Sequence, residues 1–269
     1  MSEPADATGS EMHGRSDDPI LDVEGLEKSF GGVTALDGVD LTVGPGITGL
    51  IGPNGAGKTT FFNCITGALT PDAGRVEFRS RDITGAAPSR VASEGLVRTF
   101  QIPRELGEMT VRENLQLAPP NQSGEGLVRS WLRGGSFDDD ERRVRRSARE
   151  MADFLELDHL LDERAANLSG GQRKLLELAR VLLTDPDVVL LDEPLAGVNP
   201  TLERKILERI HDLESEGYSF LFIEHDIDTI METCETVVVM HQGRVLMTGD
   251  PDAVRSDERV IEAYLGGTD

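Results

Sequence analysis

The sequence predicts an α/β fold built around a mostly parallel β-sheet. Short runs of consecutive apolar residues alternate along the chain with longer stretches of helical periodicity. One apolar run, at 47–51, leads straight into a glycine-rich loop followed by a helical stretch. Strands that are apolar on both faces are typical of parallel sheets covered by helices on both sides. A chain of 269 residues is long enough for one such domain with a smaller subdomain.

The elements before residue 95 follow from local patterns of apolar and turn-forming residues. Residues 1–18 are polar and acidic and are expected to form a disordered tail, with ordered structure beginning near Ile20. Pro71 is expected to stop the helix that starts at Lys58. The predicted elements are strands near 21–26 and at 41–43, 47–51 and 75–78, with a helix over 58–69.

The character of the chain changes near residue 94. Residues 108–165 have helical periodicity, interrupted by a polar, glycine-containing stretch at 119–137, which predicts a helical subdomain over about 96–165. The rest of 19–269 is predicted to be a single domain, with its core at 19–95 and 166–269. The predicted elements after 165 are helices at 171–183 and 201–216 and strands at 188–191, 220–223 and 237–240.

The chain is strongly acidic, with a formal net charge of −22. This charge argues against a nucleic-acid partner, which needs a basic face, and against direct docking on anionic lipid. Arginine supplies most of the positive charge, because the chain has four lysines. An excess of acidic residues keeps a protein soluble in concentrated salt, where repulsion between like charges is screened. We therefore expect a halophilic source; an ordinary acidic protein is the alternative.

Cysteine use and hydropathy are those expected of a protein of the reducing cytosol. Cys64 and Cys234 lie in apolar contexts without paired spacing, so we expect them to be core residues. No apolar stretch opens the chain, so no signal peptide is predicted. The longest apolar runs span about five residues, compared with the roughly 20 needed to cross a bilayer. A partner would therefore have to hold this chain at a membrane.

Residues 52–59 match a phosphate-binding loop, Gly-x-x-x-x-Gly-Lys-Thr. Its glycines let the backbone amides approach phosphate oxygens, and the following helix adds its positive N-terminal end. The lysine is expected to contact the β- and γ-phosphates, and the threonine hydroxyl is expected to bind Mg²⁺. A chance match in a glycine-rich turn is the alternative, disfavoured by the position between strand and helix. The candidate nucleotide-binding residues are Gly52, Asn54, Gly55, Ala56, Gly57, Lys58, Thr59 and Thr60.

An acidic pair follows the apolar run at 188–191. Asp192, at the end of that strand, is expected to help hold Mg²⁺, mostly through water. Glu193 can accept a proton from the attacking water as general base. A solvated acidic pair at a strand end is the alternative, and the phosphate-binding loop upstream disfavours it.

A second motif makes the prediction specific. Residues 168–172 are Leu-Ser-Gly-Gly-Gln, and together with the phosphate-binding loop and the acidic pair they resemble the nucleotide-binding subunits of ATP-binding cassette (ABC) transporters. The resemblance, over about 20–266, implies a RecA-like core with an antiparallel β subdomain and a helical subdomain. It also implies a head-to-tail dimer, in which this motif binds the γ-phosphate of ATP held by the opposing subunit. A plain helix cap is the alternative. The motif residues carried over are Ser169, Gly170, Gly171 and Gln172.

Three more residues match elements of the family. Gln101 matches the glutamine that contacts Mg²⁺ and water and links to the membrane partner. His225, after a predicted buried strand, matches the histidine that contacts the γ-phosphate. Phe30 matches the aromatic residue that stacks on adenine, although a single phenylalanine is more often a core residue.

Several segments resemble the importer ATPases for branched-chain amino acids. They are 98–101, 109–115, the long segment before the second motif, 196–200, 249–251 and 260–266. Asn199 replaces the aspartate usual in the loop that crosses the dimer, so coupling between the two sites could differ. Urea and short-amide importers and some lipid exporters use close relatives. The run 142–146 is strongly basic, and we favour a solvated helix face balanced by 138–141 over a partner site.

These observations predict the ATP-hydrolysing subunit of an importer, with ATP and Mg²⁺ bound, at the cytoplasmic face of the cell membrane. The expected partners are transmembrane permease subunits, a second cassette (identical or paralogous) and, indirectly, an extracytoplasmic solute-binding protein, but no nucleic acid. Ile102, Leu106 and Met109 could offer apolar contacts to the permease. A soluble ABC ATPase of iron–sulfur assembly is an alternative. The presence of Lys58, Asp192, Glu193 and His225 argues against a cassette that has lost hydrolysis.

Low salt should loosen the fold through unscreened repulsion between acidic side chains. We expect the melting temperature to rise by several degrees between about 0.1 M and about 2 M KCl, measured by circular dichroism. Sucrose, which favours compact states without screening charge, is the control. An equal melting temperature at both salt concentrations would contradict the halophilic interpretation.

Overall fold

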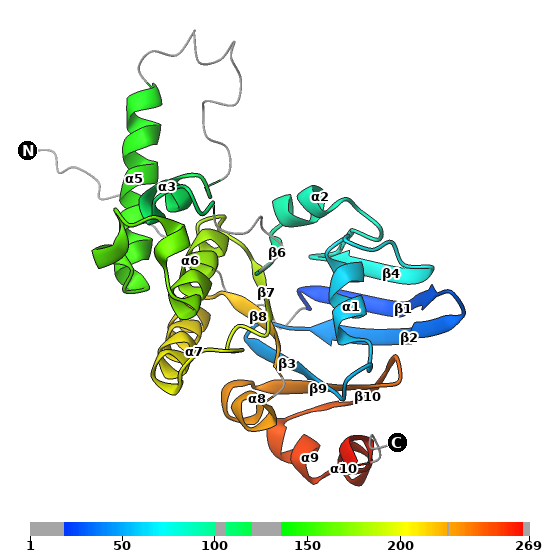
Figure 1. Ribbon diagram of the computed structural model, residues 1–269. Helices are drawn as coiled ribbons and strands as arrows, with labels where there is room; N and C mark the ends of the chain where they lie inside the picture. Colours follow the sequence, from blue (N-terminus) through cyan, green and yellow to red (C-terminus); the bar gives the residue numbers. More distant parts are fainter. Residues whose placement is uncertain (1–18, 100–105, 120–135, 225, 266–269) are drawn as a thin grey trace, which may run out of the picture.

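The structure, a computed structural model, describes residues 19–99, 106–119, 136–224 and 226–265, and its main element is a six-stranded sheet (Figure 1). Among the described residues, the neighbouring strands of this sheet pair in parallel, except that β9 and β10 pair antiparallel. The order across the sheet is β10 (Arg244–Gly249), β9 (Thr236–His241), β3 (Ile47–Ile51), β8 (Ser219–Ile223), β7 (Val188–Asp192) and β6 (Leu96–Arg98).

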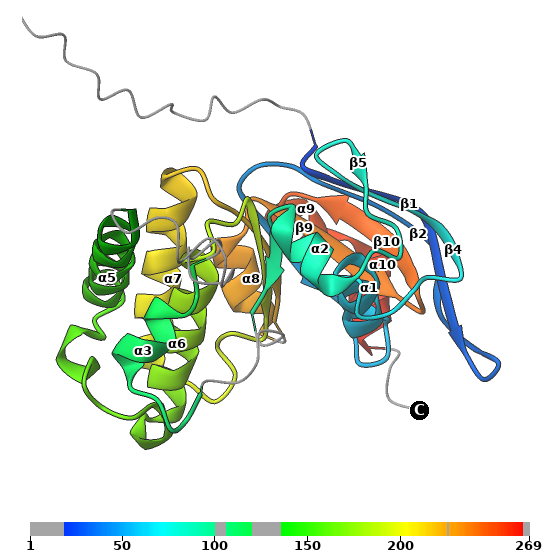
Figure 2. The ribbon, with the colours of Figure 1, turned by 90° about the horizontal axis from the view of Figure 1, so that it is seen from above.

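A second, antiparallel sheet packs beside the first. Its order is β2 (Val33–Val43), β1 (Leu21–Phe30), β4 (Ala73–Phe78) and β5 (Arg81–Asp82). Figure 2 shows α1 (Lys58–Ile65) and α2 (Pro88–Ser93) between the two sheets. The prediction of an α/β fold with a mostly parallel sheet and an antiparallel subdomain is therefore confirmed.

Helices cover the other face of the six-stranded sheet (Figure 2). α6 (Gly170–Leu182), α7 (Pro200–Ser215) and α8 (Ile227–Thr233) lie nearest the sheet, and α3 (Val111–Gln116) and α5 (Ser136–Phe154) form an outer layer. α9 (Pro251–Ser256) and α10 (Glu258–Leu265) follow β10, and short 3-10 turns at Asp158–Leu160 and Ala165–Asn167 precede α6. No helix among the described residues is long and apolar enough to cross a membrane.

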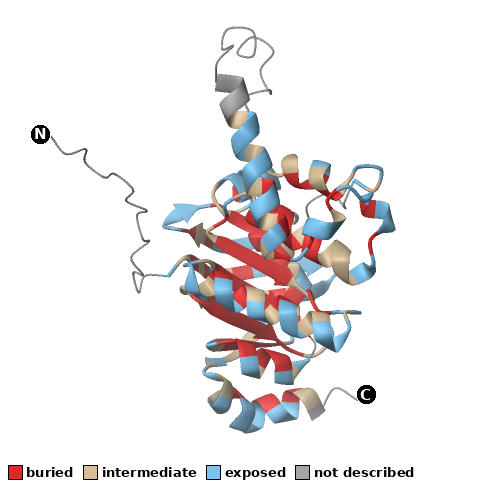
Figure 3. Ribbon diagram, turned by 90° about the vertical axis from the view of Figure 1, so that its left-hand side faces the viewer, coloured by how far each residue is buried: buried red, intermediate tan, exposed pale blue. Residues whose placement is uncertain are grey.

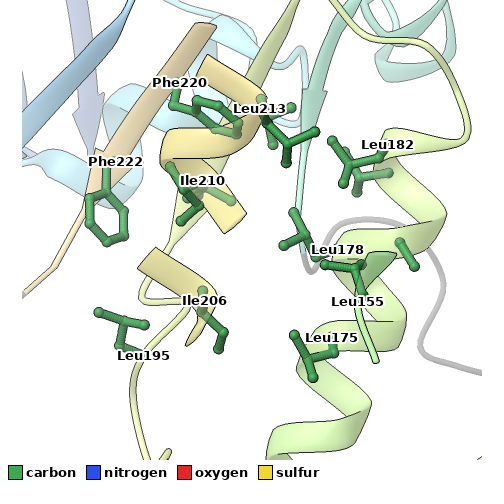
Figure 4. Close-up of a cluster of buried hydrophobic side chains, with 14 of the residues drawn as sticks. Leu155, Leu175, Leu178, Leu182, Leu195, Ile206, Ile210, Leu213, Phe220 and Phe222 are labelled. Carbon is green, nitrogen blue, oxygen red and sulfur yellow. The ribbon is translucent and has the colours of Figure 1, made fainter. Parts of the chain in front are cut away.

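The six-stranded sheet separates two hydrophobic clusters, and its strands contribute alternate residues to each. Phe220 and Phe222 face the helices, where they join Ile210 and Leu178 (Figure 4), whereas Leu221 of the same strand joins the cluster under the antiparallel sheet. Burial on both faces explains why these strands are continuous apolar runs. Figure 3 shows the buried strands at the centre and the exposed outer surface of α5.

The helix predicted over 58–69 ends at Ile65. Gly67 adopts a φ of +75°, and a Cβ there would overlap with the carbonyl oxygen of Ala86, so the chain turns before Pro71. The strand β6 also extends the sheet three residues past the predicted start of the helical subdomain. The predicted tail at 1–18 and most of the interruption at 119–137 lie outside the described residues. In the basic run, Arg143 pairs with Asp140 and Arg145 with Glu141, which supports a balanced helix face.

Candidate functional site

Three neighbouring parallel strands bring the predicted site residues to one edge of the sheet. β8 lies between β3 and β7, and Ile223 of β8 pairs with Leu50 on one side and Asp192 on the other. Because parallel strands end at the same edge, the segments that follow Ile51, Asp192 and Ile223 gather there. These segments are the phosphate-binding loop, Glu193 and Glu224.

The loop after β3 is built on glycine geometry. Gly52 has a φ of +151°, and a Cβ on it would overlap with the carbonyl oxygen of Met240. Gly57 has a φ of +104°, and its Cβ would lie 2.6 Å from the carbonyl oxygen of Ala35. Gly55, at a φ of +80°, is exposed and faces open space. The loop is thus packed closely against neighbouring backbone at its two ends and open in the middle.

The first turn of α1 is suited to bind an anion. Gly57 caps this helix with no side-chain hydrogen bond, and the first turn holds no acidic residue. Backbone amides at an uncapped helix N-terminus attract negative charge. Asn54 and Thr59 are exposed and Thr60 is half-buried, so these side chains are open to a ligand. Ala56 is buried, and its backbone contacts Pro53 and Gly243, which makes it a structural residue of the loop.

Lys58 places its ammonium group inside the loop. Nζ donates to the carbonyl oxygens of Gly52 at 2.6 Å and Pro53 at 3.3 Å. Burial lowers the pKa of Lys58, while the negative charges of Glu193 and Asp192 raise it. The loop lysine and the acidic pair, about 135 residues apart in sequence, therefore interact, as the motifs predict.

Asp192 is held from the edge strand. Arg98 of β6 donates from Nη2 to Asp192 Oδ2. The Asp192 amide donates to the Thr99 hydroxyl at 3.4 Å. Thr59 and Asp192 supply hydroxyl and carboxylate oxygens, the ligand type that Mg²⁺ prefers. The donor set of the site is therefore compatible with a magnesium nucleotide.

Glu193 has a constrained backbone. Its φ is +50°, which is unfavourable for a side chain of this size. Two contacts hold it there: its amide donates to the carbonyl oxygen of Ile223 at 2.9 Å, and its carbonyl oxygen accepts from Lys174 Nζ at 3.0 Å. The strand β7 ends at Asp192, so this constrained residue, predicted to be the general base, directly follows the strand.

The sequence prediction missed four residues that support this edge. They are Arg98, Lys174, Glu224 and Tyr264. Buried Glu224 accepts from the Leu195 amide at 2.8 Å, and burial lowers the pKa of Lys174. Burial raises the pKa of Tyr264 to about 12, although a hydrogen bond from the Gly52 backbone acts to lower it. A sequence signal exists for two of them, since Arg98 interrupts an apolar run and Glu224 directly follows one.

The second motif forms a regular helix start. The Ser169 hydroxyl accepts from the Gln172 amide at 3.3 Å, and Gln172 Oε1 accepts from the Ser169 amide at 2.9 Å. This capping box supports the helix-cap alternative for these two side chains. Ser169 and Gly170 are exposed, whereas Gly171 lets α6 approach Leu202 of α7 closely.

Asn199 caps α7. Its side-chain oxygen accepts from the amides of Thr201 and Leu202, both at 3.1 Å. Asn199, Ser169 and Gln172 share the lining of a cavity of about 270 Å³ between α6, α7 and the end of α5. Asn199, which the resemblance places in the loop that crosses the dimer, thus lies beside the second motif.

Phe30 ends β1 with 46% of its surface exposed. Lys28 Nζ lies 5.8 Å from the centroid of its ring. An exposed aromatic ring is available for stacking, and the expectation that a single phenylalanine is a core residue does not hold here. Gln101 and His225 lie outside the described residues, so their predicted roles stay predictions.

A glycine loop that holds a lysine, beside an acidic pair at the carboxyl edge of a parallel sheet, defines a nucleoside triphosphatase. Comparison with known proteins identifies the family. Residues 36–196 match the ABC transporter family model, and residues 244–269 match the model described as branched-chain amino acid ATP-binding cassette transporter.

Similar proteins match over nearly the whole chain. The probable branched-chain amino acid transport ATP-binding protein LivG of Archaeoglobus fulgidus is 43% identical, covering 93% of this chain and 96% of its own. The high-affinity LivG protein of Escherichia coli K12 is 41% identical, covering 92% and 98%. A solved nucleotide-free cassette and the ADP conformation of an ABC transporter cassette both match with 40% identity and a TM-score of 0.79, covering 92% and 93% of this chain and 99% of each.

The chain belongs to the ABC transporter family, among the branched-chain amino acid transport ATP-binding proteins. It is therefore an ATP-binding subunit that hydrolyses ATP. The predicted family, fold class and enzyme class are confirmed.

Substituting Gly52 by alanine should weaken ADP binding by about tenfold or more, because backbone strain adds to overlap with Met240. Isothermal titration with ADP measures the effect. Gly217→Ala is the matched control, since Gly217 also has a positive φ, +105°, but faces open space before the start of β8, at the end of that strand opposite to the loop. Equal ADP affinity in the two variants would show that the close approach at Gly52 does not shape the loop.

Proposed function

We propose that this cassette hydrolyses ATP with Mg²⁺ and thereby drives import of branched-chain amino acids through partner permeases. The observation that carries the proposal is the meeting of Lys58, Asp192 and Glu193 at one sheet edge. The substrate class rests on relatives at about 40% identity whose names specify branched-chain amino acid transport. The cassette would work at the cytoplasmic face of the membrane, held by its permeases.

The site divides the chemistry between backbone and side chains. The loop amides and Lys58 would bind the β- and γ-phosphates, and the Lys58 ammonium would exchange its carbonyl contacts for phosphate oxygens. Thr59 and Asp192 would hold Mg²⁺, with Gln101 as a further contact to it. When bound, Mg²⁺ neutralises charge on the phosphate oxygens.

Glu193 would accept the proton of the attacking water. Its backbone is held by Ile223 and Lys174, so the residue would be in place at the sheet edge before the nucleotide arrives. His225, two residues after the end of β8 in the sequence, would contact the γ-phosphate. Phe30 would stack on adenine, which its exposed ring permits.

A second cassette would complete each site. The exposed start of α6, at Ser169 and Gly170, would bind the γ-phosphate of ATP held by the opposing subunit. Because the side chains of Ser169 and Gln172 already satisfy each other, the contribution of this motif would come largely from backbone amides. The second cassette can be identical or a paralogue, and Asn199 would lie at the contact between the two.

The permease would dock on apolar side chains of the helical layer. Leu106, Met109 and Leu117 are exposed large apolar residues, and Leu117 has 52% of its surface accessible. They lie around α3, directly after the segment that contains Gln101 and Ile102. A contact there would connect the permease to the glutamine that approaches the nucleotide.

Replacing Glu193 by glutamine should lower the ATPase rate at least about a hundredfold while ATP binding is retained, because the amide cannot accept the water proton. The variant should accumulate as an ATP-bound dimer, seen by size-exclusion chromatography with bound nucleotide quantified. Glu208→Gln, on the exposed face of α7, is the matched control and should match the wild type. Wild-type turnover in Glu193→Gln would remove Glu193 from its role as general base.

The transport function is tested by affinity purification from native membranes in high salt, followed by mass spectrometry. We expect two permease chains and a second cassette, with an associated binding protein that retains branched-chain amino acids. Recovery of soluble partners alone, such as iron–sulfur assembly proteins, would overturn the transport function and leave the ATPase intact. Recovery of permeases with a binding protein specific for urea or an amide would overturn the proposed substrate.

A further inference from the structure

Arg98 links three elements of the nucleotide site. It ends the edge strand β6, and its guanidinium donates from Nη2 to Asp192 Oδ2 on β7 and from Nη1 to Asn63 Oδ1 on α1 at 2.7 Å. The guanidinium carbon also lies 5.3 Å from the centroid of the Phe62 ring. Sheet edge, acidic strand and the helix after the phosphate-binding loop are thus joined through one side chain.

The pair that Arg98 forms with Asp192 is largely removed from water. The Arg98 side chain is 7% exposed and that of Asp192 is 20% exposed. Burying a charged pair costs desolvation, so an apolar side chain could often stabilise such a position equally well. Arg98 also leaves Nε without a hydrogen-bond partner among the described residues. Fold stability alone therefore gives a poor reason for an arginine here.

The electrostatic surroundings single out Arg98 as the direct partner of Asp192. Lys58 donates its hydrogen bonds to loop carbonyl oxygens and interacts with the acidic pair through charge, and Lys174 donates to the backbone carbonyl oxygen of Glu193. Arg98 instead occupies one carboxylate oxygen of Asp192. Because the pair is largely removed from water, the positive charge of Arg98, hydrogen-bonded to Asp192, strongly opposes the binding of another cation at this carboxylate.

We propose that Arg98 is a positioning residue that weakens Mg²⁺ binding at Asp192 by engaging one of its oxygens. The inference rests on the proposed role of Asp192 in holding Mg²⁺. A carboxylate shared with a guanidinium offers a metal one oxygen and half-neutralised charge, so Mg²⁺ binds with moderate affinity. Moderate affinity favours release of Mg²⁺ with ADP after hydrolysis.

The test measures how Mg²⁺ changes the affinity for a fluorescent ADP analogue that carries a methylanthraniloyl group. Arg98→Met and Arg98→Gln remove the charge; the glutamine keeps hydrogen-bonding capacity, so it serves if the methionine variant does not fold. In either variant, half-maximal Mg²⁺ stimulation of binding should occur at about tenfold lower Mg²⁺ concentration. Affinity in EDTA should stay near that of the wild type.

Charge and geometry are separated by further variants. Arg98→Lys keeps the positive charge and should need nearly the wild-type Mg²⁺ concentration. Arg112→Met, which removes an arginine paired with Asp162 on the helical layer, is the matched control and should change nothing. In an Asp192→Asn background, adding Arg98→Met should no longer shift the Mg²⁺ dependence.

Two failures can be distinguished. If wild-type affinity for the analogue does not depend on Mg²⁺, the proposed metal site itself is wrong. If the wild type depends on Mg²⁺ but both neutral variants need the same or a higher concentration, Asp192 still serves the metal and the proposed weakening by Arg98 is overturned.

Discussion

The site depends on the parallel pairing of β3, β8 and β7. Leu50 and Asp192 both pair with Ile223, so one register fixes where the glycine loop and the acidic pair emerge. This register is strongly determined because alternate residues of β8 belong to different hydrophobic clusters. A slip by one residue would move Phe220 and Phe222 from the helix-covered face to the other face, so hydrophobic packing in both clusters maintains the geometry of the chemistry at the edge.

Backbone conformation contributes as much as side-chain identity. Gly52 and Gly57 make contacts with carbonyl oxygens that a side chain would block, and Glu193 occupies a conformation that most side chains avoid. These positions persist because neighbouring elements over-determine them: Met240 of β9 closes over Gly52, and Ile223 and Lys174 hold Glu193. The strands that form the sheet therefore also support the strained turns beside it.

The sequence predicted the parts of the site whose chemistry is local. The phosphate-binding loop, Asp192 and Glu193 could be proposed from the sequence because each motif places its residues relative to one strand end. Arg98 was missed because its partner Asp192 lies 94 residues away, and no local pattern encodes that distance. β10 was missed because its residues are half-buried or exposed, so it lacks the apolar run that identified β3, β7 and β8. The end of α1 depends on the contact between Gly67 and Ala86, which is also tertiary.

The distribution of charge reconciles an acidic protein with an anionic nucleotide. A net charge of −22 repels ATP at a distance, but salt screens this field beyond about 10 Å. Within that range the local cations dominate. Lys58 and Lys174, two of the four lysines, lie at the sheet edge, and burial lowers the pKa of both because the ammonium group is partly desolvated. A partly desolvated cation attracts phosphate more strongly than a surface lysine does, since less water competes for it. A chain with few lysines can therefore bind nucleotide by placing two of them, partly buried, at the carboxyl edge of the sheet, while its exposed surface remains acidic.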